Sequence, residues 1–250
     1  MRNDDKIALI TGAKGGIGSS LCSAFRAHGY FVVGTDIREE GEADCDAFLV
    51  ADIAETCRDA AALAKFRDDV LEAGAGRSMS VLVNNAAIQV LGELRDLDYA
   101  DWALSLDTNL VAPAQLIRAF EKDLADASGS VLNIASVHSK ATKPGFSCYA
   151  TTKSAMVGLT RALAVELGGR IRVNALCPAA VNTPMLREGF ANNPAGLEEL
   201  ASYHPVGRIA EPEEIGAVAL FLASPDATFL TGSVIDFDGA VLSRLYDPGS

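Results

Sequence analysis

A tyrosine and a lysine, Tyr149 and Lys153, stand four positions apart in a stretch whose apolar residues recur at helical spacing. Residues four apart share one face of a helix, so the ammonium can approach the phenol and stabilise its ionised form. A phenol that ionises near neutral pH can act as a general acid and base. Ser136 ends an earlier apolar run, before Tyr149 in the chain. Taken singly, Ser136 also fits a turn and Lys153 a surface cation.

A glycine-rich turn follows the first apolar run, with Gly12, Gly16 and Gly18 in the order Gly-x3-Gly-x-Gly. Glycines let the backbone approach a pyrophosphate closely, and the helix that begins there presents N–H donors to an anion. The pattern departs from the Gly-x-Gly-x-x-Gly fingerprint, and a plain glycine-rich turn is the alternative. Its place between a strand and a helix favours a dinucleotide site that includes Lys14 and Ile17.

An aspartate, Asp36, ends the second apolar run. A carboxylate there can accept hydrogen bonds from the adenosine ribose and repels a 2′-phosphate, so it favours NAD over NADP. Lys14 and Arg38 weaken this preference, because either cation could face a 2′-phosphate, although Lys14 could equally be solvated on the loop. Asp52, beside Ile53 after the third run, could bind the adenine edge or cap the next helix.

Short apolar runs alternate with longer amphipathic stretches along the chain, which is typical of βαβ units around a buried parallel sheet. The predicted strands are Lys6–Thr11, Tyr30–Asp36, Ala47–Ala51, Met79–Asn84, Ser130–Ser136, Ile171–Cys177 and Ser233–Phe237. The predicted helices are Gly16–His28, Glu55–Ala73, Asp101–Asp126, Tyr149–Leu167 and Glu211–Ala223. We therefore predict an α/β protein with a Rossmann-type doubly wound fold, a seven-stranded parallel sheet flanked by helices. In such sheets ligands bind beyond the carboxyl ends of the strands.

One segment interrupts the alternation. Residues 183–205 hold several prolines, asparagines and glycines between the sixth predicted strand and the last predicted helix. Such residues disfavour long regular elements. We predict that this segment is a mobile lid over a substrate site.

Composition limits the classes of function. The 250 residues suit one domain over 1–250, and 49% hydrophobic with 22% charged residues allows a large core. The formal net charge of −12 disfavours nucleic acid and anionic lipid as partners. Five scattered cysteines without a Cys-x-x-Cys pair predict free thiols and no metal site. With no long apolar run, we expect a cytoplasmic protein without a signal peptide or membrane span.

As a set, the residues above resemble the short-chain dehydrogenase/reductase family in order and spacing, together with Asn109 and the run from Asn174 to Pro178. The resemblance covers nearly the whole chain and implies hydride transfer between nicotinamide and a secondary alcohol or ketone. It implies that Tyr149 is the general acid and base and that Ser136 orients the substrate oxygen. Lys153 and the cationic nicotinamide would together lower the pKa of the phenol. Lys153 would also hold the nicotinamide ribose, and Asn109 would kink its helix and position a water.

The resemblance also implies a nicotinamide cofactor, with NAD favoured over NADP. Val181 and Thr183 would meet the nicotinamide carboxamide. The implied cofactor-binding residues are Gly12, Lys14, Gly16, Ile17, Gly18, Asp36, Asp52, Ile53, Asn85, Ala86, Ala87, Tyr149, Lys153, Pro178, Val181 and Thr183. Three alanines, Ala87, Ala179 and Ala240, stand where the family commonly has glycine. Ala87 and Ala179 lie near the expected nicotinamide site, where the added methyl would alter backbone approach.

By the same resemblance, the substrate site would be lined by Gln89, Ser136, His138, Phe146 and Met185. This mixed set predicts a small polar substrate such as a sugar, polyol, hydroxy acid or cyclic diol, ahead of an acyl carrier. His138 could bind a hydroxylated or anionic group, or it could simply face solvent.

The predicted activity is that of an NAD-dependent alcohol dehydrogenase or carbonyl reductase. The alternatives are an NADP-dependent reductase of the 3-ketoacyl type and a dinucleotide-binding sensor without turnover. Apolar residues on the long predicted helices favour homo-oligomerisation, with intramolecular packing as the alternative. The resemblance implies a homotetramer.

Overall fold

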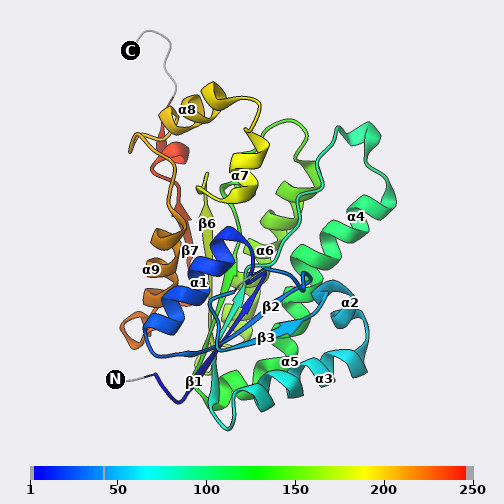
Figure 1. Cartoon of the computed structure of the whole chain (residues 1–250), viewed down its shortest axis with the longest axis vertical. Helices are drawn as coiled ribbons and strands as arrows, with labels where there is room; N and C mark the ends of the chain where they lie inside the picture. Colours follow the sequence, from blue (N-terminus) through cyan, green and yellow to red (C-terminus); the bar gives the residue numbers. More distant parts are fainter. Residues whose placement is uncertain (1–2, 42, 246–250) are drawn as a thin grey trace.

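The computed structural model describes residues 3–41 and 43–245. Its centre is a parallel sheet of seven strands in the order β3-β2-β1-β4-β5-β6-β7, which confirms the predicted doubly wound fold (Figure 1). The chain order reverses between β1 and β4, the point at which such sheets form a ligand crevice. The strands are β1 Lys6–Thr11, β2 Phe31–Asp36, β3 Ala47–Val50, β4 Ser78–Asn84, β5 Ser130–Ile134, β6 Arg172–Pro178 and β7 Val234–Phe237.

Helices cover both faces of the sheet (Figure 1). The pair α1 (Gly16–Ala27) and α9 (Pro212–Ala223) packs on one face, and α3 (Ala60–Ala73), α5 (Ala112–Asp126) and α6 (Ser147–Glu166) pack on the other.

The side chains of β1 show why the sheet is covered on both sides. Ile7 and Leu9 join a cluster with Phe120 of α5, whereas Ala8 and Ile10 join a cluster with the α1 and α9 side chains. This alternation follows from the two-residue period of a strand. All four of these β1 residues are fully buried.

Two stretches that the sequence predicts as single helices are interrupted. The stretch Glu55–Ala73 divides into α2 (Ile53–Arg58) and α3, because Asp59 is extended and its carboxylate caps α3 by accepting from the N–H of Ala62. The stretch Asp101–Asp126 divides into α4 (Tyr99–Leu106), a π-helical turn η2 (Asp107–Val111) and α5. Such π turns insert one residue and often lie at functional sites.

The segment 183–205 contains two short helices, α7 (Pro184–Gly189) and α8 (Pro194–Ser202). Each begins with proline after a polar cap, Thr183 for α7 and Asn193 for α8. Figure 1 shows both helices beyond the carboxyl ends of the strands. The remaining short elements are 3-10 turns: η1 Leu94–Asp96, η3 Val137–Ser139, η4 Pro225–Ala227 and η5 Val241–Ser243.

The three alanines that replace family glycines differ in backbone conformation. Ala240 is left-handed, with φ 69° and ψ 18°. Neither Ala87 nor Ala179 is among the non-glycine residues with positive φ in the described chain. Only the methyl group of Ala240 therefore strains the backbone, by about 1–2 kcal/mol.

We expect Ala240→Gly to raise the free energy of unfolding by about 1 kcal/mol, because relief of the left-handed strain exceeds the added freedom of the unfolded chain. Urea titration would show a higher midpoint with an unchanged slope. Ala179→Gly is the matched control and should lower the midpoint instead, since it adds unfolded-state freedom without relieving strain. A fall in the midpoint for Ala240→Gly would contradict the prediction.

Candidate active site

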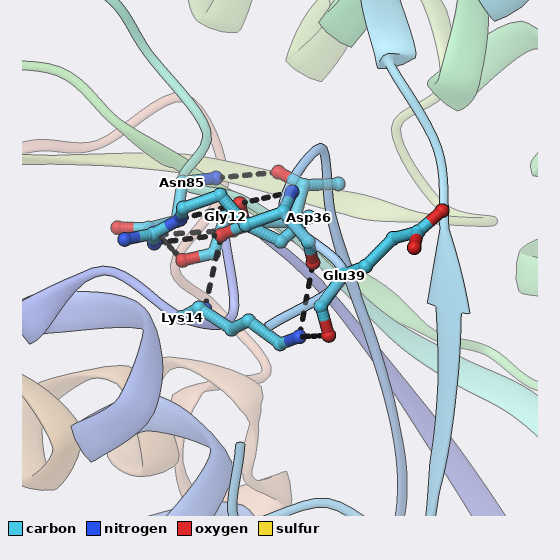
Figure 2. A network of polar contacts seen from close by, with 7 residues as sticks. Gly12, Lys14, Asp36, Glu39 and Asn85 are labelled. Atoms are coloured by element: carbon cyan, nitrogen blue, oxygen red, sulfur yellow. Dashed lines mark hydrogen bonds and ion pairs between the residues drawn. The ribbon is translucent and has the colours of Figure 1, made fainter. Parts of the chain in front are cut away.

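The turn after β1 is bonded to the loop after β4. The side chain of Asn85 donates to the carbonyl oxygens of Thr11 and Gly12 at 2.9 and 3.2 Å, and the hydroxyl of Thr11 accepts from the N–H groups of Asn85 and Ala86 at 3.0 Å. Figure 2 shows Asn85 against Gly12 in this network. The side chain of Asn85, predicted to bind cofactor, thus holds the glycine-rich turn in shape.

The glycines of this turn stand where a side chain would not fit. Gly12 has φ +65°, and a methyl group at Gly18 would lie 2.0 Å from the carbonyl oxygen of Gly12. A methyl at Gly16 would lie 2.7 Å from the methyl of Thr183.

The first turn of α1 has the properties of an anion site. The helix begins after Gly15, and among the described residues no side chain caps its first turn. Its first N–H groups, at Gly16, Ile17 and Gly18, are of the kind that bind phosphate oxygens. The close backbone and this helix end fit a dinucleotide pyrophosphate.

The carboxylate of Asp36 accepts four hydrogen bonds. Its donors are the N–H of Lys14 at 3.0 Å, the N–H of Arg38 at 3.2 Å, and two guanidinium nitrogens of Arg38 at 3.0 and 3.2 Å. Burial alone would raise the pKa of Asp36, but the bonds from Arg38 and Lys14 outweigh burial and hold the pKa below its usual value. Asp36 is therefore an anion at neutral pH, at the end of β2.

Both nearby cations are engaged with the protein. Arg38 forms its ion pair with Asp36. The ammonium of Lys14 donates to the carbonyl oxygens of Arg38 and Glu39 at 2.9 and 2.7 Å, and it lies 4.0 Å from the ring centre of Phe48. Figure 2 shows the Lys14 side chain extended toward Glu39.

Asp52 follows β3 and caps α2. Its Oδ1 accepts from the N–H groups of Ala54 and Glu55 at 2.9 and 3.2 Å. The sequence allowed Asp52 either to bind the adenine edge or to cap the next helix, and the structure contains the helix cap. Ile53, the first residue of α2, is buried.

The phenol of Tyr149 lies within hydrogen-bonding reach of the side chains of Ser136 and Gln89. Burial raises its pKa, and hydrogen bonding with Gln89 and Ser136 lowers it in part. The net direction for the protein without cofactor is upward, and the predicted lowering of the pKa by Lys153 together with the cationic nicotinamide stays a prediction. The hydroxyl of Ser136 also accepts from the N–H of His138 at 3.2 Å and approaches the carbonyl oxygen of Pro178 at 3.5 Å.

Lys153 is a buried cation one helical turn from Tyr149. Its side chain is 2% exposed, and its ammonium donates to the carbonyl oxygen of Ile134 at 2.7 Å. The ammonium lies 5.6 Å from the ring centre of Tyr149. Burial lowers the pKa of Lys153 to about 8. The lysine is therefore mostly charged at pH 7, and it is not the surface cation that its sequence position also allowed.

Asn109 lies in the π turn η2 and is fully buried. Its amide nitrogen donates to the carbonyl oxygen of Ile88 at 2.9 Å and to the hydroxyl of Thr152 at 3.1 Å, while its oxygen accepts from the N–H of Ile88 at 2.9 Å. Thr152 in turn donates to the carbonyl oxygen of Tyr149 at 2.9 Å. Asn109 thereby connects the loop after β4 to the start of α6.

The segment after β6 meets the glycine-rich turn. Val181 is buried and pairs with Ala210 in an isolated bridge. The N–H of Thr183 donates to the carbonyl oxygen of Val181 at 2.7 Å, and its hydroxyl caps α7 by accepting from the N–H of Leu186 at 3.3 Å. The methyl group of Thr183 lies close to Gly16, where it would meet any side chain at that position. Pro178, also predicted to bind cofactor, is the last residue of β6.

The predicted substrate residues fall into two groups. His138 stacks on Phe146 and contacts Tyr149. Gln89 also reaches Tyr149. Met185 is 62% exposed on α7, and the described contacts do not join it to this group.

Three polar residues in this region were given no role by the sequence interpretation. Thr11 anchors the glycine-rich turn, Thr152 connects Asn109 to α6, and Thr142 bonds His138 at 2.8 Å. Thr152 lies three residues from Tyr149 in the same helix, which is the one sequence signal available for it. In the described chain, no group of three or more His, Cys, Asp or Glu side chains is arranged to hold a metal ion.

Comparison with known proteins agrees with this geometry. Residues 12–241 match the family model described as enoyl-(acyl carrier protein) reductase. The galactitol 2-dehydrogenase (L-tagatose-forming) of Cereibacter sphaeroides is 36% identical over 250 residues, with 95% of each chain covered. The ligand-free structure of Thermoplasma acidophilum aldohexose dehydrogenase superposes with a TM-score of 0.90 at 29% identity, covering 98% of this chain and 96% of that one.

A second solved structure comes from Beutenbergia cavernae and is assigned provisionally as an NAD(P)-dependent gluconate 5-dehydrogenase. It has NADP bound at low occupancy, a TM-score of 0.83 and 31% identity, covering 96% of this chain and 97% of that one. Fold and comparisons together define a Rossmann-type oxidoreductase. The chain belongs to the short-chain dehydrogenase/reductase family, which uses a nicotinamide dinucleotide. None of the described helices is long and apolar enough to cross a membrane.

Proposed function

We propose that this protein is an NAD-dependent dehydrogenase for a secondary alcohol of a small polyol or sugar, with Tyr149 as the general acid and base. The observation that carries the proposal is the partly buried phenol of Tyr149, which lies with the buried Ser136 and the buried ammonium of Lys153 beside the ends of β5 and β6. Ser136 would orient the substrate hydroxyl. Tyr149 would take its proton as the alcohol becomes a ketone, and would return it in the reverse direction.

The chain offers residues for each part of the cofactor. The N–H groups of Gly16, Ile17 and Gly18 would bind the pyrophosphate, and Asp36 would bind the adenosine ribose. Thr183, after Pro178 and Val181, would meet the nicotinamide carboxamide. When bound, the nicotinamide accepts or returns a hydride and, when oxidised, adds a positive charge. Burial raises the pKa of the free phenol, so Tyr149 needs nearby positive charge to ionise.

Lys153 supplies part of that charge. Its ammonium stays near Tyr149 because the carbonyl oxygen of Ile134 holds it and because α6 fixes both residues on one face. Asn109 would act on Tyr149 indirectly, through Thr152, by fixing the first turn of α6. This arrangement supports a structural role for Asn109 beside the water-positioning role that the family resemblance implies.

The engagement of Arg38 and Lys14 supports NAD over NADP. Arg38 is paired with Asp36, and the ammonium of Lys14 is bonded to two carbonyl oxygens, so neither cation is held toward a 2′-phosphate. We expect kcat/KM to be at least about tenfold higher with NAD than with NADP. NADP would lose one hydrogen bond between the ribose and the charged Asp36, and its 2′-phosphate would be repelled by that carboxylate. A tenfold preference for NADP would defeat the cofactor assignment.

Asp36→Asn should lower the ratio of kcat/KM with NAD to that with NADP by about 10- to 100-fold, because it removes the charge that repels the 2′-phosphate. Arg38→Gln should raise the ratio, because it removes the cation and frees the carboxylate for the ribose. Initial rates with each cofactor would measure both variants. Asp69→Asn is the matched control and should leave the ratio unchanged, because Asp69 lies on α3 and, among residues 3–41 and 43–245, forms its ion pair with Lys65. Equal ratios in wild type and Asp36→Asn would contradict this role.

Sugars and polyols are supported as substrates by the polar and aromatic residues around Tyr149 and by the galactitol and aldohexose specificities of the relatives. The second candidate is an NADP-dependent reductase of the 3-ketoacyl type, and the description of the family model favours an acyl-carrier substrate. The net charge of −12 opposes docking of an acidic carrier. A panel of polyols, sugars, hydroxy acids and 3-ketoacyl thioesters, followed by NADH or NADPH absorbance, separates the two. We further propose a homotetramer, which sedimentation would test, and a cytoplasmic location.

A further inference from the structure

An aromatic cluster stands beside Tyr149. The imidazole of His138 is parallel to the ring of Phe146, with centroids 4.6 Å apart, and it meets the ring of Tyr149 at 75° with centroids 5.6 Å apart. The main-chain N–H of His138 also donates to the hydroxyl of Ser136 at 3.2 Å. His138 is thus joined to both residues that would act on the substrate oxygen.

The ring of His138 is fixed through one of its two nitrogens. Its Nδ1 lies 2.8 Å from the hydroxyl of Thr142, and stacking on Phe146 limits rotation of the ring. Within the described chain no hydrogen bond engages Nε2, so this nitrogen is available to a ligand. If the hydroxyl of Thr142 donates to Nδ1, the neutral ring carries its proton on Nε2, which then donates to a ligand. If Thr142 accepts from Nδ1–H, Nε2 is an acceptor.

The charge of the imidazole decides which ligand suits it. Burial, and then the charge of Lys143, lower the pKa of His138, so the ring is neutral at pH 7. The ammonium of Lys143 itself lies 4.7 Å from the ring centre of Phe146. A neutral imidazole that can both donate and accept matches a hydroxyl group, which does the same, better than it matches a carboxylate.

We propose that His138 binds a second hydroxyl of the substrate, on the carbon next to the one that is oxidised, and that the site therefore selects vicinal diols and polyols over simple alcohols. This inference rests on the proposed function. One hydroxyl would lie between Ser136 and Tyr149, and its neighbour would reach Nε2 of His138. His138 is a specificity-determining residue in this arrangement, and Thr142 positions it.

The test compares butane-2,3-diol with butan-2-ol, and cyclohexane-1,2-diol with cyclohexanol. Wild type should show kcat/KM at least about tenfold higher for each diol, the value of one good hydrogen bond. His138→Phe keeps a ring that can stack on Phe146 but has no nitrogen, and should reduce that preference about tenfold. His138→Gln retains a hydrogen-bonding group and should restore part of it, which a purely structural role would not produce.

Thr142→Val should reduce the diol preference less than His138→Phe, since it loosens the ring without removing Nε2. His28→Phe, on an exposed histidine at the end of α1, is the matched control and should leave the preference unchanged. The inference is overturned if wild type oxidises both members of each pair equally well, or if His138→Phe keeps the full preference. If wild type oxidises no polyol, sugar or simple alcohol with either cofactor, the proposed function itself fails, and the two failures are distinct.

Discussion

Replacing Tyr149 with phenylalanine should lower kcat by about 10²- to 10⁴-fold, the range that one acid–base group contributes. The change removes a single oxygen, and the ring keeps its contacts with His138 and Phe146. NAD should still bind, because the glycine-rich turn, Asp36 and the α1 N-terminus are untouched. Stopped-flow and steady-state rates of NADH formation, with NAD binding followed by calorimetry, would measure both expectations.

The matched control is Tyr99→Phe, since Tyr99 is 88% exposed at the start of α4 and outside the proposed site. It should retain full activity. The proton-transfer role of Tyr149 would be wrong if Tyr149→Phe kept most of its kcat. If the variant instead lost NAD binding along with activity, the residue would be acting on the cofactor rather than on the proton.

Replacing Gly18 with alanine should weaken NAD binding by about 100-fold or more. The new methyl group would lie 2.0 Å from the carbonyl oxygen of Gly12 and 2.9 Å from the side-chain nitrogen of Asn85. Because this carbonyl belongs to the backbone, the glycine-rich turn must move. The N–H groups at the start of α1 would then no longer be oriented toward the pyrophosphate. Loss of two hydrogen bonds to a charged group accounts for this effect, at about 1.5–3 kcal/mol each. Overpacking should also cost about 1–3 kcal/mol of stability.

Gly158→Ala is the control for this substitution. Gly158 lies within α6, and a methyl group there would meet nothing within 4 Å. Alanine favours the helix, so this variant should be more stable by up to about 1 kcal/mol and should bind NAD normally. Calorimetric titration with NAD and urea unfolding would be run on both variants. Normal NAD affinity in Gly18→Ala would show that the turn is not the pyrophosphate site.

The sequence alone determined the fold class and the order of its elements. Apolar strands that alternate with helical stretches pack compactly as a parallel sheet covered by helices on both faces. In β1, Ile7 and Leu9 lie on one face of the sheet and Ala8 and Ile10 on the other. The predicted strands also indicated that Asp36 and Ser136 would lie at one edge of the sheet, because parallel strands bring their carboxyl ends together. Asp36 does end β2, whereas β5 ends at Ile134 and Ser136 caps the following turn. The predicted cofactor and catalytic roles of these residues await the experiments above.

Tertiary structure decided the environment of each side chain. Sequence spacing puts Lys153 on one helix face with Tyr149, but only burial lowers the pKa of the lysine to about 8 and raises that of the tyrosine. Arg38 bonds Asp36 and Thr142 bonds His138 across two and four positions, so these contacts depend on loop conformation that the sequence pattern does not give. Asn109 of the π turn meets Thr152 of α6 only in the folded chain. The periodicity of apolar residues along the sequence predicts which face of a helix or strand a residue occupies. Desolvation and hydrogen-bond partners arise only when the elements pack, and these set the charges on which the chemistry depends.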